Sequence, residues 1–253
     1  MANTLINVEV FKAGVEGKFG AKRKLTQFVE TEVSNDIQVG KFNLVTNEYV
    51  GDATVVGKGV AIPLSDLKQA KQEVVFEKIA KGVAVTDEEK GQTFGDPVGN
   101  AENQTVMAIE NKMDAKVADL LKTATFTVEA TALDADAIID AVGAMGENIE
   151  DAPYYLIVST LDYADLQKAL LQTGTDLNNN PFGATVVMSG RLAKGEAYLV
   201  QEGAIKEFVQ KDTDVEVSRN AGKKQDEIYT DKIHAVYIQD QSKIVKFVIG
   251  AGE

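Results

Sequence analysis

The sequence contains no cysteine and one histidine, His234. Without cysteine, the chain cannot form disulfides, thiolate zinc sites or a cysteine nucleophile. A single histidine cannot build a histidine-rich metal site within one chain, and any catalytic triad would have to use His234. Because His234 lies in the alternating stretch IHAVYI, we predict a hydrogen-bonded histidine on one face of a strand rather than a catalytic one.

Long apolar runs are also missing. No window approaches eighteen uninterrupted apolar residues, so we expect no membrane-spanning helix. The opening residues MANTLINVEVFKAG have no basic region followed by an apolar run, so we expect no signal peptide and a protein made and kept in a cytoplasm. The net charge of -13 repels phosphate, which argues against sequence-specific nucleic-acid binding but allows a protein that surrounds DNA without gripping it.

Motifs for catalysis and ligand binding are absent as well. We find no Gly-x-Gly-x-x-Gly after a strand, no Walker lysine motif and no Asp-x-Asp-x-Asp-Gly calcium loop. Carboxylate pairs such as Asp134 with Asp136 occur at expected helix caps or polar turns, in a chain with 39 acidic residues. Nothing supplies a nucleophile or base beside them, so we predict no catalytic, cofactor or metal site and a protein that is not an enzyme.

The sequence is organised around a stretch from Asn100 to Ala124 that predicts one long helix. Apolar residues recur there at steps of three and four, namely Val106, Ile109, Met113, Val117, Leu120 and Ala124. A helix of this length spans roughly 36 Å. We expect the charged residues Glu102, Glu110, Lys112, Lys116 and Lys122 to fall mostly on its other side. The helix is therefore predicted to lie across a sheet, with its second side exposed or against a neighbour.

The first 35 residues show a weak pattern. Gly14, Gly17 and Gly20 are expected to interrupt any helix there, and residues 22–24 form the only dense basic cluster. The interpretation that we prefer for this cluster is a solvated turn. The alternative is an extended arm that docks on a neighbouring subunit, since so glycine-rich a segment is poorly suited to pack on itself.

Residues 40–72 are strand-like and rich in turns. The dipeptide Gly51-Asp52 and the tripeptide Gly57-Lys58-Gly59 separate short β-prone runs, which predicts a hairpin or a long two-stranded loop. An isolated hairpin is marginally stable in water. We therefore expect this loop to need a partner surface, which indicates assembly.

The remaining chain alternates between strands and helices and then becomes mostly β. Residues 73–85 predict a strand, and Thr86 to Glu89 have capping-box spacing for a short helix. Residues 134–201 predict a compact α/β unit in which YYLIVS is a buried strand. Four candidate strands follow, and Asp240-Gln241-Ser242 is predicted as a hairpin turn between the last two.

Taken together, the order of these elements resembles the major capsid proteins of tailed bacteriophages. The clearest stretches are GATVVMSG at 183–190, EAYLV at 196–200, DVEVSRN at 214–220 and HAVYIQDQSKIVKFVI at 234–249. The segment APYYLIVSTLDYADLQKAL, residues 152–170, is similar to the strand and helix of the family's axial domain. FEKIAKGVAVTDEE, residues 76–89, resembles the segment before its spine helix.

The resemblance implies an α+β fold of the tailed-phage capsid type. Its expected parts are an N-terminal arm at 1–35, an extended loop at 36–72, a peripheral domain at 73–130 with the spine helix at 100–124, an axial domain at 131–240, and a C-terminal strand at 241–253 that returns to the peripheral domain.

The resemblance also implies a structural protein of the virion, in which hexamers and pentamers of the chain form an icosahedral shell around packaged double-stranded DNA. It implies assembly in the host cytoplasm, a portal, and a separate scaffolding protein, because this chain has no room for a scaffolding segment of its own. The alternatives are an encapsulin-like compartment and a carboxylate-dependent hydrolase. We expect the inter-subunit contacts to include Phe11, Phe19, Arg23, Phe42, Tyr49, Lys58, Glu110 and Lys116.

Overall fold

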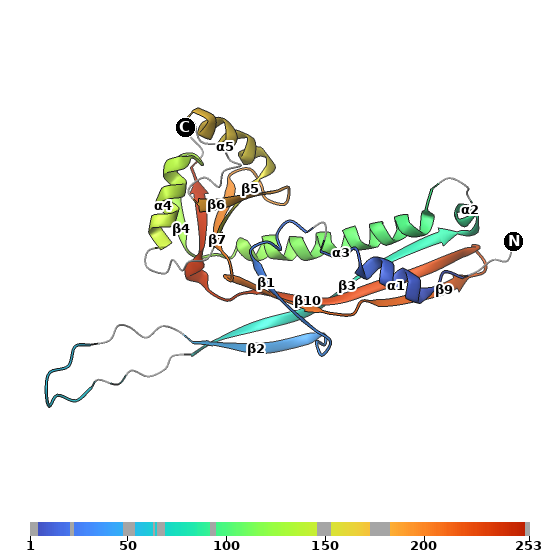
Figure 1. Ribbon diagram of the computed structural model, residues 1–253, viewed down its shortest axis with the longest axis horizontal. Helices are drawn as coiled ribbons and strands as arrows, with labels where there is room; N and C mark the ends of the chain where they lie inside the picture. The colour runs from blue at the N-terminus through green and yellow to red at the C-terminus, as the bar shows by residue number, and fades with distance from the viewer. Residues whose placement is uncertain are drawn as a thin grey trace.

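The computed structural model describes residues 5–20, 23–47, 54–62, 64, 69–91, 95–145, 153–172 and 183–250. The chain forms two lobes, each built on one sheet, with a long helix that starts on the first lobe and ends beside the second (Figure 1). A two-stranded hairpin extends from the end of the first lobe that lies below the second lobe, toward the lower left of the view. In the part of the chain that is described, no helix is both long enough and apolar enough to cross a membrane.

The first lobe contains a six-stranded sheet in the order β1-β8-β10-β3-β2, with β9 paired to the outer half of β10. Its strands are β1 (Val29–Ser34), β2 (Gly40–Asn47), β3 (Gln69–Thr86), β8 (Ile205–Gln210), β9 (Asp214–Asn220) and β10 (Gln225–Ile238). The prediction of a strand over 73–85 is confirmed, although β3 begins before it and extends into the hairpin.

Helix α3 (Pro97–Leu121) lies along β3 and β10 and confirms the predicted long helix. Asp96 caps it by accepting a hydrogen bond from Gly99 N, and Pro97 occupies the first turn, where a missing N–H costs nothing. The expectation that Glu102 and Glu110 face away is wrong, since both are buried. At 100° per residue they lie only about 40° from Val106, inside the apolar stripe.

Two short helices accompany the first lobe. The capping box predicted at residues 86–89 is confirmed at the start of α2 (Asp87–Lys90). Residues 8–16 form α1 (Val8–Glu16), which packs on α3, so the prediction that glycines prevent a helix here is wrong. A Cβ atom at Gly14 would lie 2.5 Å from the Glu102 carboxylate, so the glycine leaves room for that side chain between the two helices.

The second lobe contains a five-stranded sheet in the order β4-β11-β7-β5-β6, flanked by two helices. Its elements are β4 (Thr127–Ala130), α4 (Ala135–Met145), β5 (Tyr154–Ser159), α5 (Thr160–Gln172), β6 (Ala184–Ser189), β7 (Glu196–Gln201) and β11 (Ile244–Ile249). The predicted caps are confirmed, because Asp134 accepts a hydrogen bond from Ala137 N and Ser159 accepts one from Asp162 N.

The continuous apolar run of β5 has a structural reason. Leu156 and Val158 pack against α4 and α5, whereas Ile157 faces a separate core shared with the end of α3 and with residues of the first lobe. A strand buried on both faces has no solvent side, so its apolar pattern does not alternate. This shared core, which includes Leu25 and Phe28 of the arm, joins the two lobes.

The strand pairing divides the chain differently from the expected domains. β11 pairs with β4 and β7 in the second lobe, so the hairpin predicted at residues 240–242 is wrong. Strands β8, β9 and β10, expected within the axial domain at 131–240, belong instead to the sheet under α3. A short 3-10 turn, Gln241–Lys243, carries the chain from one sheet to the other.

The predicted hairpin is confirmed in a different register. Its strands are β2 and the start of β3, which pair from Gly40 opposite Phe76 to Asn47 opposite Gln69. Residues 54–62 contain a turn in which Val60 N donates to Gly57 O, and Gly59 has a φ of 84° that suits glycine. Within 54–62 and at 64 the structure contains no strand, so the β-prone runs of the sequence lie in the loop at the end of the hairpin.

Candidate assembly surfaces

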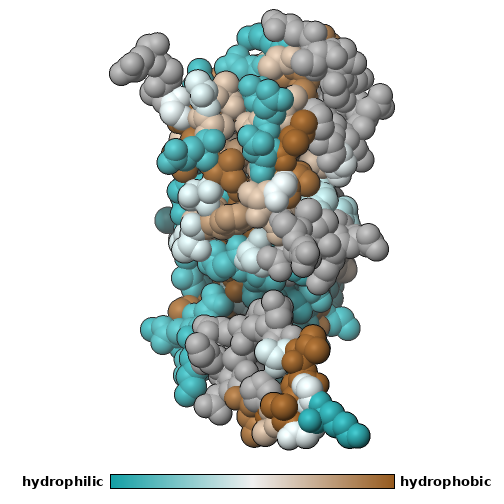
Figure 2. Space-filling view, turned by 90° about the vertical axis from the view of Figure 1, so that its left-hand side faces the viewer, coloured by the Kyte–Doolittle hydropathy of each residue, from teal (hydrophilic) through white to brown (hydrophobic). Residues whose placement is uncertain are grey.

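The loop at the end of the hairpin exposes large apolar side chains. Val55, Val60, Ile62 and Leu64 have exposed fractions between 64% and 104%. Figure 2 shows apolar side chains gathered at the lower end of the molecule, where this loop projects. An exposed apolar cluster on a soluble protein indicates a surface that another molecule covers.

The root of the hairpin is held by an aromatic cluster on the face of the sheet opposite α3. Phe42 of β2 stacks on Phe76 of β3 at 5.1 Å between ring centroids, and both rings contact Phe208 of β8. Phe208 in turn stacks on Tyr237 of β10 at 5.7 Å. Because these rings come from four neighbouring strands, they anchor the hairpin to the lobe while its end stays free.

The N-terminal arm is bound along α3 by a row of carboxylates. Lys18 Nζ lies 2.6 Å from Glu102 Oε2, and Gly20 N donates to Glu110 Oε1. Lys24 N donates to Asp114 Oδ2. The arm therefore runs parallel to α3 and meets an acidic side chain every one to two turns of the helix.

Arg23 lies at the end of this row of contacts, in a buried cluster of charged side chains. Its guanidinium, with a side chain only 5% exposed, lies 3.1 Å from Asp114 Oδ1 and 2.6 Å from Glu207 Oε2 of β8. Burial lowers the pKa of Arg23, but its contacts with Glu207 and Asp114 outweigh burial and raise it. The interpretation of residues 22–24 as a solvated turn is therefore wrong for Arg23.

His234 belongs to the same cluster. Its Nδ1 lies 2.7 Å from Glu207 Oε1, in agreement with the prediction of a structural histidine in a strand. Burial raises the pKa of Glu207, but the contacts with His234 and Arg23 outweigh burial and lower it. Glu207 is therefore an ionised carboxylate between a guanidinium and an imidazole.

A second charged cluster ties the start of the described chain to the far end of the first lobe. Asp226 of β10, which is fully buried, accepts hydrogen bonds from Ile6 N at 3.0 Å, from Arg219 and from Lys90. Arg219 also forms a bidentate pair with Asp87 at 2.7 and 2.6 Å. These bonds connect β9, β10, α2 and the segment before α1.

We predict that Asp226→Asn destabilises the protein and reduces its sensitivity to acid. Burial raises the pKa of Asp226, but bonds from Lys90, Ile6 and Arg219 outweigh burial and lower it. A lowered folded-state pKa gives stability that is present above the ordinary aspartate pKa, about 3.9, and is lost as the pH falls through the folded value. Denaturant titrations at several acidic pH values measure the effect, and an unchanged acid profile in the variant would contradict it.

Six of the eight residues predicted to contact neighbouring subunits make contacts within their own subunit. Phe11 of α1 is fully buried, the Phe19 ring centroid lies 4.3 Å from Lys232 Nζ, and Lys116 pairs with Glu77 of β3 at 2.6 Å. Arg23, Glu110 and Phe42 make the internal contacts described above. Lys58 is exposed on the loop, and Tyr49 lies outside the described residues. Phe11 and Glu110 are buried and the Arg23 side chain is 5% exposed, whereas Phe19, Phe42 and Lys116 are partly exposed and Lys58 is exposed, so of the seven described residues these last four keep surface that a neighbour could contact.

Sequence reasoning missed the acidic residues that hold the arm. Glu102, Glu110 and Asp114 lie at spacings of eight and four, in the same stripe as Val106 and Met113. That spacing could have indicated a bound segment, because a carboxylate buried within an apolar stripe needs a hydrogen-bonding or charged partner. Glu207 and Asp226 carried no comparable signal, since their partners come from distant parts of the chain.

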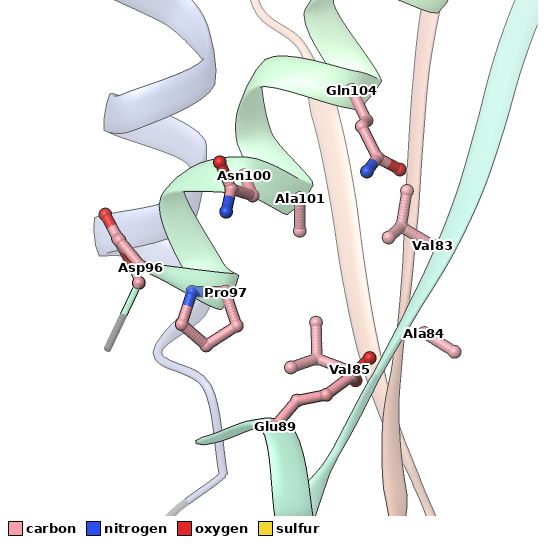
Figure 3. A pocket seen from close by; sticks show the side chains of 10 residues that line it. Val83, Ala84, Val85, Glu89, Asp96, Pro97, Asn100, Ala101 and Gln104 are labelled. Atoms are coloured by element: carbon pink, nitrogen blue, oxygen red, sulfur yellow. The ribbon is translucent and has the colours of Figure 1, made fainter. Parts of the chain in front are cut away.

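A cavity of about 360 Å³ lies at the start of α3, between α2 and β3 (Figure 3). Its two carboxylates have structural roles: Glu89 accepts from Thr86 N in the capping box, and Asp96 accepts from Gly99 N as the N-cap. The other lining residues are Val83, Ala84, Val85, Gly95, Pro97, Asn100, Ala101 and Gln104. This lining contains no serine, threonine, tyrosine, lysine or histidine to act as nucleophile or base.

Comparison with known proteins defines the class to which this fold belongs. The sequence pattern of the family described as "Phage capsid protein" matches residues 69–246. A major capsid protein of Staphylococcus phage phiMR11 is 31% identical over 258 residues, which covers 96% of this chain and 93% of that protein.

Solved structures share the fold at low sequence identity. The capsid of cyanophage P-SCSP1u has a TM-score of 0.69 at 13% identity and covers 92% of this chain and 90% of that one. The capsid of an empty GTA particle has a TM-score of 0.72 at 13% identity and covers 90% of each chain. Both likenesses confirm the expected α+β capsid fold.

The fold and the exposed hairpin loop define a shell-forming structural protein. The chain belongs to the phage capsid protein family. Its function is that of a structural head-shell protein and component of the virion, and the comparisons do not support the encapsulin-like compartment or the hydrolase.

Proposed function

We propose that copies of this chain join into hexamers and pentamers of a closed shell through the apolar loop on the β2–β3 hairpin. The observation that carries this proposal is the exposure of Ile62 and Leu64, at 75% and 96%, on a loop held away from the body of the subunit. Covering such side chains stabilises an interface by about 1.5–3 kcal/mol each. Lys58, at the turn of the same loop, is the charged contact that we assign to this interface.

The shell is proposed to enclose double-stranded DNA without sequence-specific contacts. A net charge of -13 supports this, because an acidic wall does not hold phosphate tightly. We extend the proposal to assembly in the host cytoplasm with a separate scaffolding protein and a portal, which rests on membership of the capsid family. The role is that of a structural component rather than of an enzyme.

The double variant Ile62→Asp, Leu64→Asp tests the proposed interface. We expect folded subunits whose yield of closed particles falls roughly a hundredfold or more, because two buried apolar contacts become two buried charges. Electron microscopy and sedimentation of purified protein measure the yield.

Val10→Asp is the matched control for this variant. Val10 is 65% exposed and lies in the first turn of α1, where an added carboxylate suits the helix dipole. We expect this control to assemble normally. Normal particles from the double variant would contradict the proposed interface.

A further inference from the structure

A polar cavity of about 360 Å³ lies where the arm, α3 and the turn after β6 meet. Its lining residues are Lys24 of the arm, Asn111 and Asp114 of α3, and Ser189, Gly190 and Arg191 at the end of β6. The cavity at the start of α3 shares none of these residues, and its charged lining residues are both carboxylates. The lining of the cavity beside Arg191 instead combines two cations with one carboxylate.

The one carboxylate in this lining already has partners. Asp114 Oδ1 lies 3.1 Å from Arg23 Nε, and Asp114 Oδ2 accepts a hydrogen bond from Lys24 N at 3.2 Å. Both oxygens of Asp114 are therefore bonded to the arm backbone or to a guanidinium that does not line the cavity.

The two cations are not paired with carboxylates. Within the described part of the chain, neither Lys24 nor Arg191 has a carboxylate oxygen within 4.0 Å of its charged nitrogens. The Arg191 guanidinium donates to the neutral amide oxygen of Asn111 at 2.8 Å, and Lys24 is exposed. Asn111 keeps the hydrogens of its Nδ2, and Ser189, whose Oγ accepts from Arg191 N, keeps its hydroxyl hydrogen. The lining thus presents hydrogen-bond donors from four side chains, two of them cationic.

We propose that this cavity binds a phosphate group, either of the free ion or of a phosphodiester. A phosphate presents its oxygens tetrahedrally and can meet donors from the arm, α3 and the β6 turn at once, whereas the two oxygens of a carboxylate lie in one plane. Arginine and lysine form charge-assisted hydrogen bonds with phosphate oxygens, and the guanidinium fork suits them in shape.

The net charge of -13 does not decide the sign of the potential in this cavity. Salt at physiological ionic strength screens exposed charges over about 8 Å, so the nearest groups determine the local potential. A site with two cations gives weak, local binding. It differs from the broad basic surface with which a protein grips nucleic acid, so it is compatible with a shell that encloses DNA without holding it tightly.

Equilibrium dialysis of the purified full-length chain against radiolabelled inorganic phosphate tests the site. The method works with subunits and with particles alike, so its outcome is independent of the proposed shell interface. At neutral pH and constant ionic strength we expect saturable binding of about one phosphate per chain. Arg191→Gln and Lys24→Gln should each raise the dissociation constant about tenfold, because each removes one charge-assisted contact. Thermal melting followed by circular dichroism reports that the variants are folded.

Lys223→Gln is the matched control. It removes the same charge from an exposed lysine in the turn between β9 and β10, outside the lining of the cavity. This variant should bind phosphate as the wild type does. The proposal is overturned if the wild type shows no saturable binding, or if Lys223→Gln and Arg191→Gln weaken binding equally.

Competing ligands identify the source of the phosphate. Thymidylyl-thymidine, which carries one phosphodiester, displaces the labelled ion if the site accepts the backbone of DNA. If only unlabelled phosphate displaces it, the site is specific for the free ion. Equal displacement by acetate at the same concentration overturns the assignment to phosphate, because the cavity would then hold any small anion.

Discussion

Replacing Arg23 with methionine should reduce the free energy of unfolding by about 3–5 kcal/mol, the cost of removing one partner from a buried ion pair. The Arg23 side chain is 5% exposed and contacts both Asp114 and Glu207. Methionine fills similar volume but leaves two buried carboxylates without their guanidinium. Urea unfolding of purified subunits, followed by circular dichroism, measures the loss.

The neighbouring residue supplies the control for this prediction. Lys24→Met removes a charge of the same sign one position along the chain, but the side chain is exposed and only its backbone N–H contacts Asp114. We expect a change within about 0.5 kcal/mol. Similar losses for the two variants would mean that the general charge of the arm, rather than the buried site, stabilises the subunit.

Replacing residues 48–68 with the dipeptide Asn-Gly should abolish shell formation and leave the subunit folded. Asn47 and Gln69 are the last paired residues of β2 and β3, so a two-residue turn joins the strands at the existing register. Asn-Gly suits the tight turn of a two-residue hairpin. The aromatic cluster at the hairpin root, from Phe42 to Tyr237, remains intact. Analytical sedimentation should show small species in place of particles.

A substitution that keeps the loop complete serves as the reference. Thr54→Ala changes an exposed polar residue of the same loop and should leave the particle yield unchanged. If the shortened protein assembled with a normal yield, the hairpin loop would not be the main contact between subunits, and the proposed interface would have to lie elsewhere on the two lobes.

Helices and strands were predictable where the residues that determine them lie close together in the sequence. The periodicity of Val106, Ile109 and Met113 predicted α3, and the caps at Asp134 and Ser159 depend on residues within three positions. The apolar run of β5 predicted a buried strand, which the structure confirms. The prediction for α1 was wrong because it considered glycine content alone, and the packing of this helix on α3 cannot be seen in the sequence.

The candidate surfaces were predictable only in part. The turn-rich sequence around Lys58 indicated an extended loop that needs a partner, and the structure exposes its apolar residues. The sequence did not reveal the internal contacts of Arg23, Glu110 and Phe42, because their partners lie far away along the chain. A charged or aromatic residue shows in sequence that it needs a partner but not which one it has.

By itself, the sequence determined the kind of protein: cysteine-free, acidic, without a recognisable catalytic motif, with one long helix, a projecting hairpin and an order of elements similar to that of phage capsid proteins. Only the tertiary structure decided which sheet each strand joins, that β11 leaves β10 for the second lobe, and that the arm lies in a row of carboxylates on α3. The physical reason is range. Periodicity, caps and turns act over a few residues, whereas the contacts that hold the arm join distant residues: Gly20 and Glu110 are 90 positions apart, and Arg23 and Glu207 are 184 positions apart.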